Sequence, residues 1–365
     1  MSWVRLDFSQ RVTLGPLFRE KSSLTLLGGA FPGYFALVMA TGIVSLAMDD
    51  QGYVAIARAL FAINIGAYAL LWIAGCARIA HAPRALAHEL GNHVGGPAFL
   101  TIVAGTCVLG VQCAQLAGGR FAASALWVLA LVLWLALIYA FFAAVTVIEP
   151  KPRLEQGLDG SWLLATVATE SIAVLGTVVA PQFPRPDIVV FACLSFFLAG
   201  AMLYILVIGL IFFRWTFRPM DVHTLTPTYW INMGAVAITT LAGARLEASA
   251  PDYAFVAGIE HFLAGFTLFF WATGSWWVPL LVAVFAWRHL HQRVPIRYDP
   301  QYWSLVFPLG MYSVATHAYG EAGGLAFLDP LARIAGDISL AAWLLAMLGL
   351  ARRLLQRRTE TSAVR

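Results

Sequence analysis

The chain has 365 residues, of which 60% are hydrophobic and only 12% are charged. A soluble protein carries about 25% charged residues, so this composition excludes a soluble globular domain and indicates a polytopic membrane protein. The formal net charge of +4 does not indicate nucleic-acid binding, because basic residues gather in the loops on one side of a membrane protein.

Ten apolar segments follow one another along the chain, bounded by charged residues, glycine or proline. A helix of about 20 apolar residues crosses a bilayer, so the sequence predicts ten transmembrane helices within one transport domain, residues 31–355. Residues 1–30 are predicted to be a cytoplasmic lead-in, and residues 356–365 a basic cytoplasmic tail. The predicted helices span residues 31–48, 55–80, 96–116, 122–148, 161–180, 187–213, 228–246, 255–288, 301–319 and 331–355.

The eighth segment, 255–288, is long and is interrupted by Gly274 and Pro279. Proline removes a helical hydrogen bond and clashes with the preceding turn. We therefore expect this helix to bend there or to end early.

Basic residues predict the orientation of the helices, because cytoplasmic loops of membrane proteins are enriched in Lys and Arg. With both termini on the cytoplasmic side, most basic residues fall in cytoplasmic segments. The orientation therefore predicts a multi-pass inner-membrane protein with both ends inside. The exceptions, on or near the opposite face, are Arg58, Arg120, Arg185, Arg245 and Arg333.

The odd-numbered segments resemble one another, and they differ from the even-numbered ones. They begin with similar text, such as "FPGYFALVMATG", "GPAFLTIVAGT" and "SWLLATVATES", and carry Gly, Ser or Thr near their centres. The even segments are bulkier, which suits contact with lipid, whereas small and hydroxylated residues suit close packing or a polar lumen. This alternation predicts an all-α fold of five quasi-symmetric helical hairpins, with the odd helices inside around a central pore. A solid bundle, in which Gly, Ser and Thr only serve packing, is the alternative.

Glu170 is the one charged residue in the fifth segment, 161–180. An ionised side chain at the bilayer centre costs roughly 2.5–3.5 kcal/mol on insertion scales, and no basic residue lies at a comparable depth. Burial then favours the neutral acid, which could bind a proton in transit, and Glu170→Gln would abolish any pH dependence of uptake. The alternative is a protonated carboxyl that joins two helices as a structural hydrogen bond.

No motif predicts a metal, a cofactor or catalytic residues. The histidines of "HELGNHV", His88 and His93, are five residues apart, whereas a zinc-binding helix needs a spacing of four. The four cysteines stand singly in apolar segments without the spacing of a zinc or redox motif. ATP-driven transport is not indicated either, because no phosphate-binding glycine loop follows a strand.

Several long segments resemble the tellurite-resistance/dicarboxylate transporter family, also called the voltage-dependent anion channel family. They include "FPGYFALVMATGIVSLA", "GSWLLATVATESIAVLG" and "RYDPQYWSLVFPLGMYSVAT". Malate permease, sulfite exporters and plant slow-type anion channels belong to that family. The resemblance implies five helical hairpins, a homotrimer, and a phenylalanine on the ninth helix that occludes the pore, which corresponds to Phe307 here.

Together, these observations predict a channel or secondary transporter for small anions, such as malate or oxyanions, with proton coupling left open. Its expected partners are the anion, membrane lipid and two further copies of the chain. A membrane-integral enzyme and a non-conducting scaffold are the alternatives. Phe307 is the predicted gate, and the predicted pathway residues are Thr41, Ser45, Thr101, Thr106, Thr169, Glu170, Thr239, Thr240 and Ser313.

Overall fold

The computed structural model describes residues 32–362, with side chains for residues 32–356. Within these residues the chain is all-helical and contains no strand. This confirms the predicted all-α class. The predicted lead-in, residues 1–30, and the last three residues lie outside the described part of the chain.

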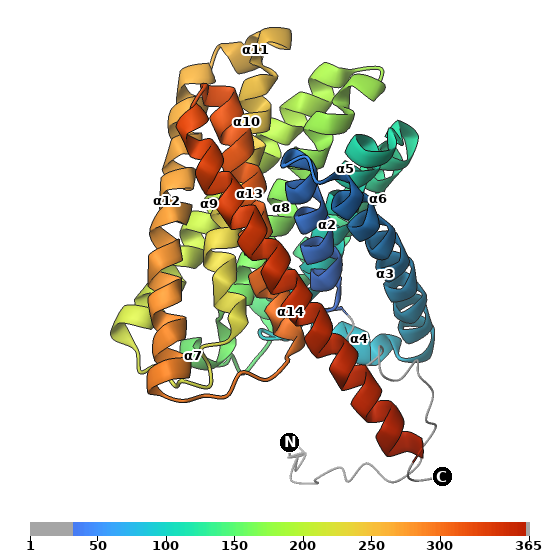
Figure 1. Ribbon diagram of the computed structural model, residues 1–365, viewed down its shortest axis with the longest axis vertical. Helices are drawn as coiled ribbons and strands as arrows, with labels where there is room; N and C mark the ends of the chain where they lie inside the picture. The colour runs from blue at the N-terminus through green and yellow to red at the C-terminus, as the bar shows by residue number, and fades with distance from the viewer. Residues whose placement is uncertain (1–31, 363–365) are drawn as a thin grey trace, which may run out of the picture.

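The long helices alternate along the chain between two kinds, and Figure 1 shows them packed side by side. We call the first kind the inner helices: α2 (Phe35–Asp50), α5 (Leu100–Ala117), α8 (Leu164–Val179), α10 (Ile231–Ala248) and α13 (Trp303–Gly323). The second kind are the outer helices: α3 (Val54–His81), α6 (Arg120–Val147), α9 (Pro186–Phe217), α12 (Glu260–Ala286) and α14 (Asp329–Ser362). Short helices α4 (Pro83–Leu90), α7 (Leu154–Gly157) and α11 (Ala254–Ala257) lie in the connections.

Burial separates the two kinds of helix. In the most apolar stretches of α5 and α8, 78% and 89% of residues are buried, whereas the outer helices bury between 22% and 33%. Large apolar side chains of the outer helices, such as Phe121, Leu206 and Leu345, are exposed. Seven helical segments are long and apolar enough to cross a membrane, and this surface needs lipid to cover it.

The inner helices form a closed ring. Around it, α2 packs against α5, α5 against α8, α8 against α10, α10 against α13, and α13 against α2 again. Glycines permit close approach at two of these contacts, because a Cβ on Gly234 would overlap Pro308, and one on Gly310 would overlap Ile43. Each inner helix also packs against the outer helix that follows it in the chain.

Two helix ends differ from an expectation. Helix α12 runs from Glu260 to Ala286 through Pro279 and continues as a π-helical turn, Trp287–His291, so it does not end early at Gly274 or Pro279. A membrane-spanning helix tolerates an internal proline when neighbouring helices support it, and here α12 packs along α10. At the other boundary, α14 remains helical to Ser362, beyond the predicted end at 355.

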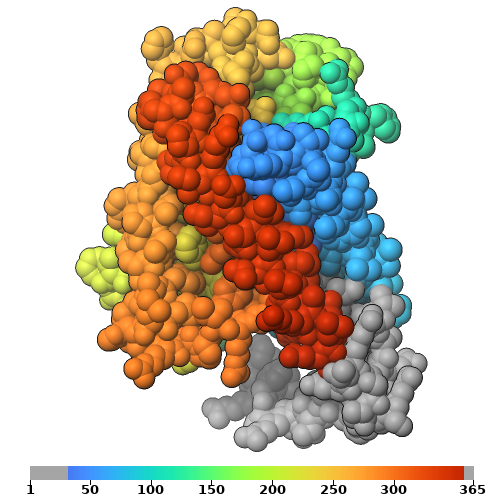
Figure 2. All heavy atoms as spheres, viewed as in Figure 1, coloured from blue at the N-terminus to red at the C-terminus, as the bar shows by residue number. Residues whose placement is uncertain are grey.

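Helix α14 closes the bundle on one face. It crosses the molecule as a long diagonal ridge, next to the N-terminal helices on one side and α12 on the other (Figure 2). In the chain it is the last helix, yet it packs against both α13 and α2. The two ends of the described chain therefore meet along this ridge.

Candidate functional site: the axis of the inner helices

A narrow pocket lies on the axis of the ring, and all five inner helices line it. Its deeper wall is mostly apolar, and Ser171 is the one hydroxyl there, while charged and amide side chains stand toward the C-terminal ends of the helices. The cavity volume of this pocket is about 20 Å³, which is enough for about one water molecule. The lining residues are Ile43, Leu46, Asp50, Cys107, Val108, Val111, Gln115, Ser171, Val174, Ile238, Leu241, Arg245, Met311 and Val314.

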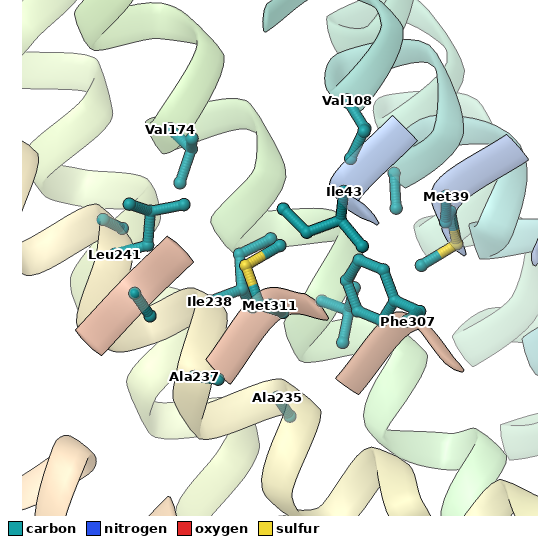
Figure 3. Close-up of a cluster of buried hydrophobic side chains, with 14 of the residues drawn as sticks. Met39, Ile43, Val108, Val174, Ala235, Ala237, Ile238, Leu241, Phe307 and Met311 are labelled. Atoms are coloured by element: carbon teal, nitrogen blue, oxygen red, sulfur yellow. The ribbon is translucent and has the colours of Figure 1, made fainter. Parts of the chain in front are cut away.

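Phe307 lies one helical turn before Met311, on the same face of α13. Its side chain is 1% exposed, and it lies in a cluster with Ile43, Met311 and Met39 (Figure 3). Directly below the axial pocket, the space among the inner helices is thus filled by an aromatic ring and its apolar neighbours. The axial pocket itself holds about one water molecule, which is too little for a hydrated anion.

The hydroxyl residues of the predicted pathway are all buried, but their hydrogen bonds run toward the backbone or toward outer helices. Ser45 donates to the carbonyl of Ala57 on α3, and Ser313 to that of Ala332 on α14, both at 2.7 Å. The hydroxyls of four threonines donate to carbonyls in their own helix: Thr106, Thr169, Thr239 and Thr240. The hydroxyl of Thr101 donates to the carbonyl of Ala98, in the short 3-10 turn before α5. None of the predicted hydroxyl residues lines the axial pocket.

An aromatic side chain of an outer helix hydrogen-bonds the inner helix of the next hairpin at each of the five junctions. We call these contacts the aromatic clamps. Four of them end on a threonine hydroxyl, and the fifth, from Tyr204, ends on the carbonyl of Asn232. The hydrogen-bonded pairs are Tyr68–Thr106, Trp134–Thr169, Tyr204–Asn232, Trp271–Thr316 and Trp343–Thr41.

The clamp between Trp343 and Thr41 joins the last hairpin to the first. We expect Trp343→Phe to lower stability by about 1 kcal/mol, because it removes one buried hydrogen bond and leaves the threonine hydroxyl without its donor. Thermal unfolding in detergent measures the loss. In a Thr41→Val background the same substitution should have a much smaller effect, and equal effects in both backgrounds would contradict the clamp.

Glu170 is fully buried, and its carboxyl points away from the axial pocket toward α9. A Cβ on Gly200 would overlap its Oε1 atom, and Thr239 of α10 lies beside it. Neither carboxyl oxygen has a hydrogen-bond partner among the described side chains. The structure thus places a buried, unpartnered carboxyl between α8, α9 and α10.

The mouth of the axial pocket carries two charged residues that sequence reasoning did not select, Asp50 and Arg245. Asp50 also lines a neighbouring pocket, which we call the rim pocket, together with His317, Asp329 and Arg333. Arg245 was read from the sequence only as a marker of orientation. The one sequence signal for a role at the pocket mouth is its position, three residues before the end of an inner helix.

The ring of buried helices and the exposed apolar surface of the outer helices define an integral membrane protein. The family model described as "Voltage-dependent anion channel" (SLAC1) matches residues 30–351. The chain therefore belongs to the voltage-dependent anion channel family. This confirms the resemblance seen in the sequence.

Three relatives illustrate the range of similarity. A sulfite efflux pump of Trichophyton rubrum is 23% identical over an alignment of 362 positions, which covers 91% of this chain and 92% of the relative. An uncharacterised transporter of Methanocaldococcus jannaschii is 23% identical, over 81% of this chain and 86% of the relative. An uncharacterised membrane protein of Mycobacterium tuberculosis (strain H37Rv) is 42% identical over 143 residues, 39% of this chain and 71% of the relative.

Proposed function

We propose that the protein moves small anions across the inner membrane along the axis of the five inner helices, with Phe307 as the gate. The observation that carries the proposal is the position of Phe307, buried on the axis directly below a pocket that all five inner helices line. A bulky ring at a constriction closes a pore sterically and by dewetting, without any charge. Opening then requires only that the ring rotate or the helices separate.

The proposed substrates are oxyanions such as sulfite and small dicarboxylates such as malate. The similarity to a sulfite efflux pump supports the first class. The proposed arrangement has all ten long helices crossing the membrane as five hairpins, both termini in the cytoplasm, and three copies in the assembled protein. The short inner helices are then shielded from lipid by the outer ring.

Flux into proteoliposomes tests this proposal. We expect protein-dependent uptake of sulfite, nitrate, chloride or malate above that of empty vesicles, with preferences among the four that identify the substrate class. The Phe307→Ala variant is measured in parallel, because a closed wild-type gate would hide the pathway. If neither protein carries any of the four anions, the transport proposal is wrong and a non-conducting scaffold or a membrane enzyme becomes the better reading.

Glu170 is the proposed proton site if transport is proton-coupled. Its burial and the lack of a counter-charge favour a neutral carboxyl, and release of that proton would need water or a base to reach it. We expect Glu170→Gln to abolish anion accumulation driven by an imposed proton gradient, while anion exchange at equal pH on both sides continues. Gradient-driven accumulation that survives in the glutamine variant would leave Glu170 with a structural role.

A further inference from the structure

Arg245 brings an unpaired positive charge to the wall of the axial pocket. Among residues 32–356 its guanidinium makes no hydrogen bond and no ion pair within 4.0 Å, and its Nε atom is buried without a partner. The residue is half-buried and stands on α10 where the pocket approaches the helix ends. A buried donor without an acceptor is costly, and an arginine fork matches the geometry of carboxylates and oxyanions.

Asp50 is the acidic group that shares the axial pocket with Arg245. Desolvation in the mouth raises the pKa of Asp50 to about 6, although His317 and Arg245 pull it down, while Asp49 and Glu321 add to the rise. The other charged groups at this mouth, Asp329 and Arg333 of α14, line the rim pocket. The charge of Asp50 therefore changes near neutral pH, next to the arginine.

We propose that Arg245 is the residue that receives the anion at this mouth, and that Asp50 is a titratable counter-charge that weakens anion binding when it is ionised. This inference rests on the proposed function and adds a recognition site and its regulation. The ligand is a small anion with a planar or tetrahedral cluster of oxygen atoms. The site lies on the axis above Phe307, so it would fill before the gate opens.

The sign of the pH effect follows from the two charges. Above about pH 6, Asp50 is negative, offsets the field of Arg245 and repels an incoming anion. Below that pH it is neutral, and the arginine acts alone. His317 lies beside Asp50 in the rim pocket, 3.7 Å from Glu321 and 4.0 Å from Asp329. Anion binding and entry should therefore rise as the pH at this mouth falls.

Nitrate flux in the Phe307→Ala background tests the inference, because nitrate keeps its charge across the relevant pH range and the gate no longer limits entry. With equal pH on both sides, we expect flux to rise about 5-fold from above to below pH 6, the size of one charge–charge interaction in a partly wet mouth. Asp50→Asn should give the high flux at both pH values. Arg245→Gln should lower it about 10-fold at both, and Arg245→Lys should restore part of it.

Two control variants isolate the pair. His317→Gln should keep most of the pH response if Asp50 carries it. Arg333 is also an arginine, but it lines the rim pocket and not the axial pocket. Arg333→Gln should therefore leave both the nitrate flux and its pH dependence near the values of the Phe307→Ala parent. A pH profile that Asp50→Asn leaves unchanged would overturn the inference.

A binding measurement separates this inference from the transport proposal. Nitrate that binds the folded protein raises its melting temperature in detergent, and we expect a larger shift below pH 6 than above it in wild type, and no such difference in Asp50→Asn. If this pattern appears without any flux, the anion site stands and transport falls. If flux occurs but neither Arg245 nor Asp50 changes it, transport stands and the mouth site falls. If nitrate causes no shift and no flux, both are wrong.

Discussion

Phe307→Ala should raise anion conductance in planar bilayers by about tenfold or more. The substitution removes the ring that fills the axis below the pocket, and a tenfold increase requires that the barrier to passage fall by only about 1.4 kcal/mol. Single-channel or macroscopic current in nitrate measures the change. The effect should grow with the volume removed, so Phe307→Leu should fall between the alanine variant and wild type.

Phe270→Ala provides the matched control for the gate. Phe270 is as buried as Phe307, but it lies on the outer helix α12 against Tyr204 and Phe266. Both substitutions remove a buried ring and both should cost about 3–5 kcal/mol of stability, but only the one on the axis should open a path. Equal currents from wild type and a folded Phe307→Ala protein would show that Phe307 is not the gate.

Gly200→Ala should destabilise the protein through Glu170. The new methyl group would overlap Oε1 of the buried carboxyl, and overpacking of this kind costs about 1–3 kcal/mol. In a Glu170→Ala background the same substitution should cost much less, because the carboxyl that it displaces is gone. Melting temperatures of the four proteins in detergent give the coupling between the two positions.

Gly209→Ala is the control on the same helix. A Cβ at Gly209 meets no atom within 4 Å, so alanine there should be neutral or slightly stabilising through its higher helix propensity. If Gly200→Ala is equally harmless, Glu170 is free to move. That result would mean that the carboxyl can rotate away from α9.

The sequence was sufficient to predict the helices and which of them leave most of their residues unburied. A segment such as 122–148, made mainly of Leu, Ala, Val, Trp and Phe, is expected to face lipid, and α6 (Arg120–Val147) leaves most of its residues unburied. The predicted limits agree closely with the structure at most ends, because charges and glycines mark where apolar segments leave the membrane. Whether Pro279 ends its helix was not predictable, because that depends on neighbouring helices that a local pattern does not record, and α12 continues through it.

The direction in which each side chain points could not be predicted from the sequence composition of a helix. Thr41 and Thr169 sit on inner helices, as expected, but their hydroxyls accept hydrogen bonds from tryptophans of outer helices. A threonine that faces a lumen and one that receives such a donor look alike in a sequence, because both roles need a small hydroxyl on a buried helix. Whether the predicted hydroxyls contact an anion stays a prediction, and the residues on the axis itself are mainly Ile, Val, Leu and Met.

The meeting of α14 with α2 has a consequence for biosynthesis. Trp343 follows Thr41 by 302 positions, so the first hairpin to leave the ribosome must wait in the bilayer until the last one has been inserted. A nascent chain that stops before α14 would leave one side of α2 open to lipid and to quality-control proteases. Supplying α13 and α14 as a separate polypeptide should rescue such a truncated chain, because the seam is held by packing and a hydrogen bond rather than by chain connectivity.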